Sequence, residues 1–172
     1  MEVGKVIRKL ATLTDVDLPR DATDEGFGKI NECLSAIGTN TMEATRVRLD
    51  VIAEMAAANK EKAKSRMIVD LKRADLQVND KEVQEGKNDT HRKAIADVKL
   101  AKELSTATKS DIEYQHLQSV LDASRKVLEA LKQHKELAGH LLNVVQKEMD
   151  LGLVTPATVG GVDPGHKVGR PR

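Results

Sequence analysis

The sequence is poor in aromatic residues. Phe27 and Tyr114 are the only two, and there is no Trp among the 172 residues. A compact globule of this length normally uses aromatic side chains to fill its core. Their scarcity in a chain rich in Ala, Leu, Glu, Lys and Gln indicates long helices packed side by side. We therefore expect an all-α fold.

Cysteine and long apolar runs are also scarce. Cys33 is the single cysteine, so no internal disulfide can form and nothing indicates secretion. It lacks a CxxC partner or a charged histidine that would mark a nucleophile, and we expect it to be simply buried. No apolar run approaches the length of a membrane span, and the N-terminus lacks a signal-peptide core. These features predict a cytoplasmic protein that does not contact membranes.

Catalytic and metal-binding motifs are missing as well. No two histidines have the i, i+4 spacing that places two ligands on one helical face. The segment "GGVDPGHK" lacks the Gly-Lys-Ser/Thr of a phosphate-binding loop and has no strand before it. No Ser/His/Asp set is present. We expect a protein that is not an enzyme and that uses neither a metal nor another cofactor.

Proline and glycine divide the chain into three parts. Residues 1–38 are expected to form short helices around "DLPRDATDEGFG", with a helix over Lys29–Ile37 that ends at Gly38. Residues 39–151 are expected to form a long antiparallel, coiled-coil-like helical hairpin. Residues 152–172 hold the last three prolines and are expected to form a flexible basic tail.

The first long helix is predicted from about Thr41 to Gln77, capped by Thr39 or Thr41. Its expected inward stripe repeats at helical spacing and consists of Leu49, Ile52, Ala56, Ala63, Met67, Leu71 and Ala74.

The second long helix is predicted from about His91 to Leu151, after a polar connection at 78–89, with Asp89 or Thr90 as its cap. The segment "STATKSDIE" is β-branched and contains a capping-box pattern, which would favour a break or kink. We nevertheless expect one long helix. The expected main stripe is Ile95, Val98, Leu104, Ile112, Leu117, Leu121, Leu128, Leu131, Leu142, Val145 and Met149.

Beyond Leu117 the apolar residues of this helix cover more than one face, and a hairpin buries only one stripe per helix. We expect the surplus to join subunits of a homo-oligomer. The alternative is that residues 1–38 fold over it. The oligomerisation residues are predicted to be Leu117, Val120, Leu121, Val127, Leu128, Leu131, Leu141 and Val145.

The net charge of +1 hides an uneven distribution, because residues 60–102 contain 12 Lys/Arg against 8 Asp/Glu. Positive charge in mid-chain is typical of a protein that binds polyanions. Several of these cations, among them Lys60, Lys64, Lys72 and Arg73, are expected to share one helical side. The alternative is a merely solvated helix face. The predicted DNA-contacting residues are Lys60, Lys64, Arg66, Lys72, Arg73, Arg92, Lys93, Arg170 and Arg172.

The last two of these lie in the closing segment "GHKVGRPR". A Gly-Arg-Pro core with basic neighbours resembles a hook for the DNA minor groove. With so few aromatic residues, we expect no contribution from base stacking. Binding is expected to act through phosphates, with little sequence preference and a strong salt dependence.

Two stretches resemble the UvsY family of phage recombination mediators. "DIEYQHLQSVLDASRKVLEALK" at 111–132 is similar to the family's C-terminal helical segment, and "VDLKRADL" is similar to its basic segment. The resemblance covers roughly residues 45–145. Carried over, the family's DNA-contacting Lys and Arg fall on Lys72 and Arg73, although the Ala that separates them in the family is missing here.

The resemblance implies a non-enzymatic protein that binds single-stranded DNA in the host cytoplasm. Its partners would be a RecA-like phage recombinase and a single-strand-binding protein, and it would form a ring-like homo-oligomer of about six to seven subunits. Two alternatives stay open: a structural or scaffolding coiled-coil phage protein, and an architectural protein that holds double-stranded DNA by its Gly-Arg-Pro tail.

Overall fold

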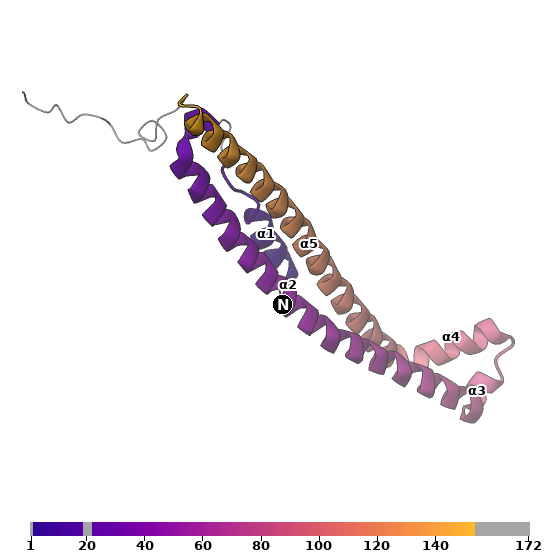
Figure 1. Cartoon of the computed structure of the whole chain (residues 1–172). Coiled ribbons are helices and arrows are strands. Elements are labelled where there is room, and N and C mark those ends of the chain that lie inside the picture. Colours follow the sequence, from indigo (N-terminus) through magenta and orange to yellow (C-terminus); the bar gives the residue numbers. More distant parts are fainter. Residues whose placement is uncertain (1, 19–21, 154–172) are drawn as a thin grey trace, which may run out of the picture. The chain divides into compact units, whose positions relative to one another are not determined.

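The structure, a computed structural model, describes residues 2–18 and 22–153. Every regular element in these ranges is a helix: α1 (Val3–Thr12), α2 (Ala22–Asn79), α3 (Lys81–Gln84), α4 (Asp89–Lys99) and α5 (Ala101–Asp150) (Figure 1). The expected all-α fold with long helices is confirmed. Of the predicted tail, residues 154–172 lie outside the described residues.

The chain forms two compact units, and α2 and α5 contribute to both. The turn unit comprises Arg48–Ala123 together with the first residues of the chain. The terminal unit comprises Gly4–Val47 and the chain from Ser124 onward. Each unit is described by itself.

In the turn unit, α2 and the return of the chain through α4 and α5 are antiparallel neighbours. Ion pairs join Arg66 to Asp111 and Arg73 to Asp97. The later residue of α2 therefore pairs with the earlier residue of the returning chain, which is the antiparallel order. The buried side chains of this unit are mostly aliphatic, with two serines among them. The buried residues of this unit include Val51, Ser65, Val69, Val83, Ala96, Leu100, Ala107, Ser110, Leu117 and Val120.

Two capping side chains shape the turn between α2 and α4. Asp80 accepts a hydrogen bond from the backbone N–H of Val83 and starts α3. Asn88 accepts one from the N–H of His91 at 2.8 Å and starts α4. The cap of α4 is therefore Asn88, and the prediction of Asp89 or Thr90 was wrong by one or two residues.

In the terminal unit the first part of α2 packs against the last part of α5, and Lys9 of α1 pairs with Glu43 of α2. Ile30 and Val145 are fully buried against each other, surrounded by partly buried apolar neighbours. Asn40 donates its side-chain N–H to the carbonyl of Leu13 at 2.9 Å, which fastens the segment after α1 to α2. The start of α2 thus covers apolar side chains in the last part of α5. The partly buried side chains that pack against Ile30 and Val145 are Leu34, Leu141, Leu142 and Met149.

The predicted helix end at Gly38 is absent. Helix α2 continues through Gly38, and Thr39 and Thr41 bond back to the carbonyls of Ser35 and Ile37 instead of capping. A mid-helix glycine costs about 1 kcal/mol, and burial of Ile30, Cys33, Ile37 and Ala44 along α2 outweighs it.

Helix α5 likewise continues through "STATKSDIE". Thr106, Thr108 and Ser110 each donate their hydroxyl to the carbonyl four residues earlier. The hydroxyls are therefore used inside the helix and do not cap a new one. The interruption lies instead at Leu100, a buried residue between α4 and α5.

The predicted inward stripe of the first long helix was wrong. Leu49, Met67 and Leu71 are 59–61% exposed, and the buried positions are Val51, Ser65 and Val69 on the opposite side. On α5 and α4 most of the predicted stripe is at least partly buried, but Val98 and Ile112 are exposed. Val120 and Val127, expected off the stripe, are in the core.

Candidate nucleic-acid interface

Two grooves flank the line of contact between α2 and α5 in the turn unit. The lysine groove has a volume of about 240 Å³ and is lined by Glu61, Lys64, Ser65, Ile68, Lys72, Lys102, Glu103 and Thr106. The arginine groove has a volume of about 360 Å³ and is lined by Arg66, Val69, Asp70, Arg73, Leu104, Ala107, Thr108 and Asp111.

The helical repeat explains why the basic stretch divides between the grooves. Successive residues of an α-helix turn by about 100°, so Lys64 and Lys72 fall on one side of the buried Ser65 and Val69. Arg66 and Arg73 fall on the other side. The expectation that Lys72 and Arg73 share one face was therefore wrong.

Carboxylates from α4 and α5 form ion pairs with the arginines of the arginine groove. Arg66 donates to Asp111 at 2.7 Å, and Arg73 donates to Asp97 at 2.6 Å. The hydrogen bond from Arg66 lowers the pKa of Asp111, and the same bond raises the pKa of Arg66. A phosphate would have to displace these carboxylates, so the groove is suited to holding the helices together.

Lys62 adds to the same cluster. Its ammonium lies 3.5 Å from Asp111 and 4.5 Å from the centre of the Tyr114 ring, a cation–π distance. One of the two aromatic residues of the chain thus serves a contact between α2 and α5. Tyr114 covers a lysine and is not free to stack on a base.

The lysine groove keeps more of its positive charge exposed. Lys72 pairs with Glu103, and the hydrogen bond from Lys72 lowers the pKa of that carboxyl. The side chain of Lys72 is still 53% exposed, and that of Lys64 is 65% exposed with Glu61 at 4.0 Å. Lys102 supplies a third ammonium from α5. Three lysines therefore face two glutamates here.

The sequence reasoning missed Lys102. The antiparallel pairing of α2 with α5 places position 102 beside position 72, as the neighbouring Lys72–Glu103 pair shows. Only the register of the two helices could have revealed it, and that register depends on the length of the turn between them.

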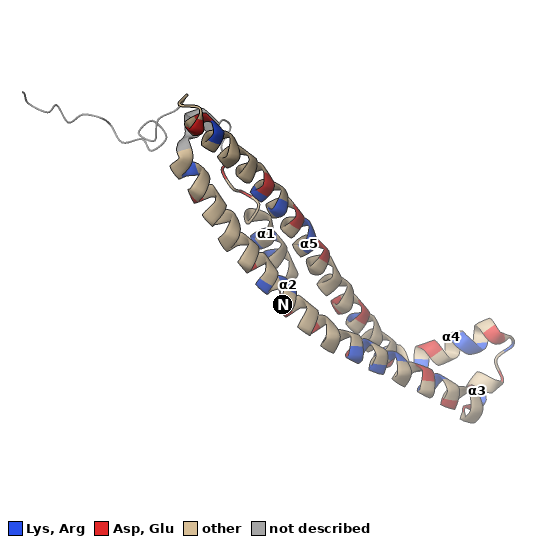
Figure 2. Ribbon diagram, viewed as in Figure 1, with Lys and Arg blue, Asp and Glu red and all other residues tan. Residues whose placement is uncertain are grey.

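The remaining predicted cations of the turn unit lie elsewhere. Arg92 donates its Nε–H to the carbonyl of Gly86 at 3.1 Å and holds the turn between α3 and α4. Lys93 is exposed on α4. Lys60 lies on the exposed face of α2, with Leu49 and Met67, and lines neither groove. Figure 2 shows the basic and acidic positions along these helices.

At the end of α4, opposite α3, the cation and the carboxylates exchange sides. Lys99 contacts Asp80 at 2.6 Å and Glu82 at 2.8 Å, so here the cation lies on the returning chain. The hydrogen bonds lower the pKa of Asp80 and raise that of Lys99. The two other predicted DNA contacts, Arg170 and Arg172, lie outside the described residues.

Most of the predicted oligomerisation residues are buried within the chain's own units. Leu117, Val120, Val127, Leu131 and Val145 are each at most 7% exposed. In this conformation they are not available at the surface to a second subunit. Leu121, Leu128 and Leu141 are partly buried.

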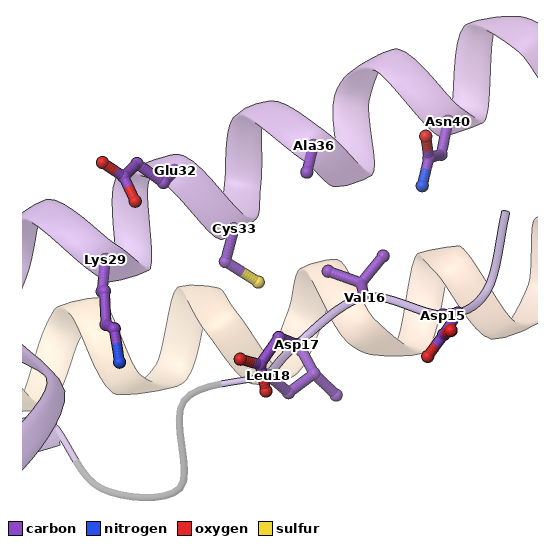
Figure 3. A pocket seen from close by; sticks show the side chains of 9 residues that line it. All are labelled: Asp15, Val16, Asp17, Leu18, Lys29, Glu32, Cys33, Ala36 and Asn40. Carbon is purple, nitrogen blue, oxygen red and sulfur yellow. The ribbon is translucent and has the colours of Figure 1, made fainter.

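A depression in the terminal unit, of about 290 Å³, contains Cys33 (Figure 3). The thiol is 6% exposed, as expected for a buried cysteine. Burial, and then the nearby charge of Asp17, raise its pKa. The thiolate is therefore disfavoured at neutral pH, and the depression does not contain an activated nucleophile.

The part of the chain that the structure describes contains no group of three or more His, Cys, Asp or Glu side chains placed to hold a metal ion. None of its helices combines the length and apolar composition needed to cross a bilayer. No protein-family model, curated protein or solved structure matches the chain.

Proposed function

We propose that the chain is a single-stranded-DNA-binding recombination mediator that acts as a homo-oligomer of long helical hairpins. It would help a RecA-like phage recombinase replace single-strand-binding protein on DNA, in the host cytoplasm. The resemblance of 111–132 and of "VDLKRADL" to the UvsY family supports this proposal. Mediation needs no catalysis, because a protein that stabilises one of two competing complexes shifts the balance by mass action.

The observation that carries the proposal is the lysine groove. Lys64, Lys72 and Lys102 come from two helices fixed against each other, so three ammonium groups stand in one groove of the turn unit. Ammonium groups bind phosphates as point charges and do not read bases. Such a surface follows a backbone of any sequence, which a mediator requires.

The binding partner would be the strand's phosphates, since stacking has little to contribute. Tyr114 is engaged by Lys62, and Phe27 lies in the terminal unit. Affinity is then expected to fall steeply with salt, because bound phosphates release counterions.

A structural coiled-coil protein is the second candidate, and one observation favours it. Arg66, Lys72 and Arg73 all reach carboxylates of α4 or α5. Charges used in this way set the register of two helices and need no nucleic acid.

Fluorescence anisotropy with single- and double-stranded oligonucleotides of equal length separates these functions. The mediator proposal predicts tighter binding to single strands, and retention of the protein on strands already covered by single-strand-binding protein. A preference for double strands would favour an architectural protein. If the chain binds neither oligonucleotide at low salt, the structural coiled-coil function is the candidate that remains.

A further inference from the structure

The side of α2 that faces away from α5 in the turn unit is an apolar stripe. Leu49, Ile52, Met67, Leu71 and Val78 are 45–70% exposed on it. Exposed alanines continue the stripe between them, at positions 56, 63 and 74. At ~1.5 Å per residue the stripe is roughly 45 Å long. An apolar surface of this extent marks an interaction site.

The stripe contains two charged positions that matter for its partner. Lys60 lies along its middle and Asp70 lies at its edge, both exposed. Lys60 lines neither groove, whereas Asp70 also borders the arginine groove, where its charge helps to raise the pKa of Arg66. A charge in an apolar interface is tolerated where the partner supplies the opposite charge.

Several positions of the stripe, though not Leu49 and Leu71, pair symmetrically about position 65. Ile52 and Val78 lie equally far before and after that position, and so do positions 56 and 74, both alanine. Lys60 and Asp70 are likewise equidistant from it. In the middle, Ala63 matches Met67 in the same way.

This symmetry is what a two-fold pair of identical helices requires. When two copies meet antiparallel, residue i of one copy meets residue j of the other, and j meets i. Centred on position 65, Ile52 would meet Val78 and Ala63 would meet Met67, whereas Leu49 and Leu71 would lie opposite Lys81 and Asn59. Lys60 of each copy would meet Asp70 of the other, and the small Ala56–Ala74 contacts would let the backbones approach.

We propose that the outer face of α2 between Leu49 and Val78 binds a second copy of this chain in an antiparallel pair centred on position 65. A parallel pair in register is disfavoured, because Lys60 would face Lys60 and Asp70 would face Asp70. The interface differs from the α5 residues predicted from the sequence, most of which are buried. It rests on the homo-oligomer of the proposed function, for which it names an interface, and it needs no DNA.

Charge reversal tests the proposal in the full-length chain without DNA. Sedimentation equilibrium would compare the natural chain with Lys60→Glu, with Asp70→Lys and with the double variant. Each single change turns two attractions per pair into repulsions and should weaken association by about tenfold. The double variant should regain most of the natural affinity. Lys126→Glu, at an exposed position of α5, is the control and should change nothing.

Disulfide trapping tests the direction of the pair in a Cys33→Ala background. Chains carrying Ala56→Cys mixed with chains carrying Ala74→Cys should form cross-linked dimers on oxidation, and either chain alone should form few. A monomeric natural chain would overturn the proposal. So would a double variant as weak as the single variants, or efficient cross-linking of Ala56→Cys chains with one another. These outcomes leave the DNA-binding proposal untested and separate from this one.

Discussion

Arg66 on α2 and Asp111 on α5, 45 residues apart in the chain, are joined by a hydrogen-bonded ion pair of 2.7 Å. Similar pairs join Arg73 to Asp97 and Lys99 to Asp80. Together they fix the register of the two helices in the turn unit. The same pairs decide which cations remain exposed for other contacts.

The lowered pKa values of Asp80, Glu103 and Asp111 predict that stability depends on pH. A carboxyl whose pKa is lower in the folded state contributes stability above its unfolded pKa. That contribution is lost as the pH falls through the folded pKa. We expect the melting temperature to fall from about pH 5 downward. Circular dichroism melts across this range measure it.

Asp111→Asn is the matched variant for this pH dependence. It removes the charge that Arg66 stabilises, so the variant should melt lower at neutral pH and lose less on acidification. An equal acid dependence in both proteins would show that the Arg66–Asp111 pair does not contribute.

Two glycines should respond in opposite ways to alanine. A Cβ on the buried Gly86 would lie 3.1 Å from the backbone nitrogen of Arg92, so Gly86→Ala should destabilise the turn. A Cβ on Gly38 meets nothing within 4 Å, so Gly38→Ala should stabilise α2 by about 1 kcal/mol. Urea denaturation of both variants measures whether each change lowers or raises the free energy of unfolding. A stabilising Gly86→Ala would contradict the close approach to Arg92.

Leucines at two positions of α5 test which side chains form the core. Leu131 is fully buried and Leu137 is 46% exposed. Leu131→Ala should lower the free energy of unfolding by about 2–5 kcal/mol, whereas Leu137→Ala should have a much smaller effect. Denaturation at two protein concentrations supplies the control. If the loss of unfolding free energy caused by Leu131→Ala grows when the protein is diluted, this side chain acts between subunits instead.

The helical class of the fold followed from composition, but the side of each helix that is buried did not. The stripe through Leu49, Met67 and Leu71 has a clear helical period and yet faces away from α5. The buried side of α2 in the turn unit uses Ser65 and Val69, together with Arg73 at its edge. Hydrophobic periodicity does not identify an interface built from small and charged residues.

The local boundaries depended on contacts remote in sequence. Gly38 would end an isolated helix, but burial of Ile30 and Ile37 keeps α2 continuous. Similarly, Lys102 joins the lysine groove because the turn fixes which residues of α2 and α5 are neighbours. The basic stretch itself was visible in the sequence, and its division between two grooves was not.

The central claim, that the lysine groove binds the phosphates of single-stranded DNA, is tested most directly by the salt dependence of binding. The variant Lys64→Ala/Lys72→Ala/Lys102→Ala would be compared with a control of equal charge, Lys126→Ala/Lys135→Ala/Lys147→Ala, whose lysines are exposed elsewhere on α5.

Each phosphate contact on a single strand contributes about 0.7 to the slope of log affinity against log salt, so loss of three contacts should reduce the slope by about 2. The account predicts this reduction, with weaker binding, in the groove variant alone. Equal slopes and affinities in the two variants would contradict it.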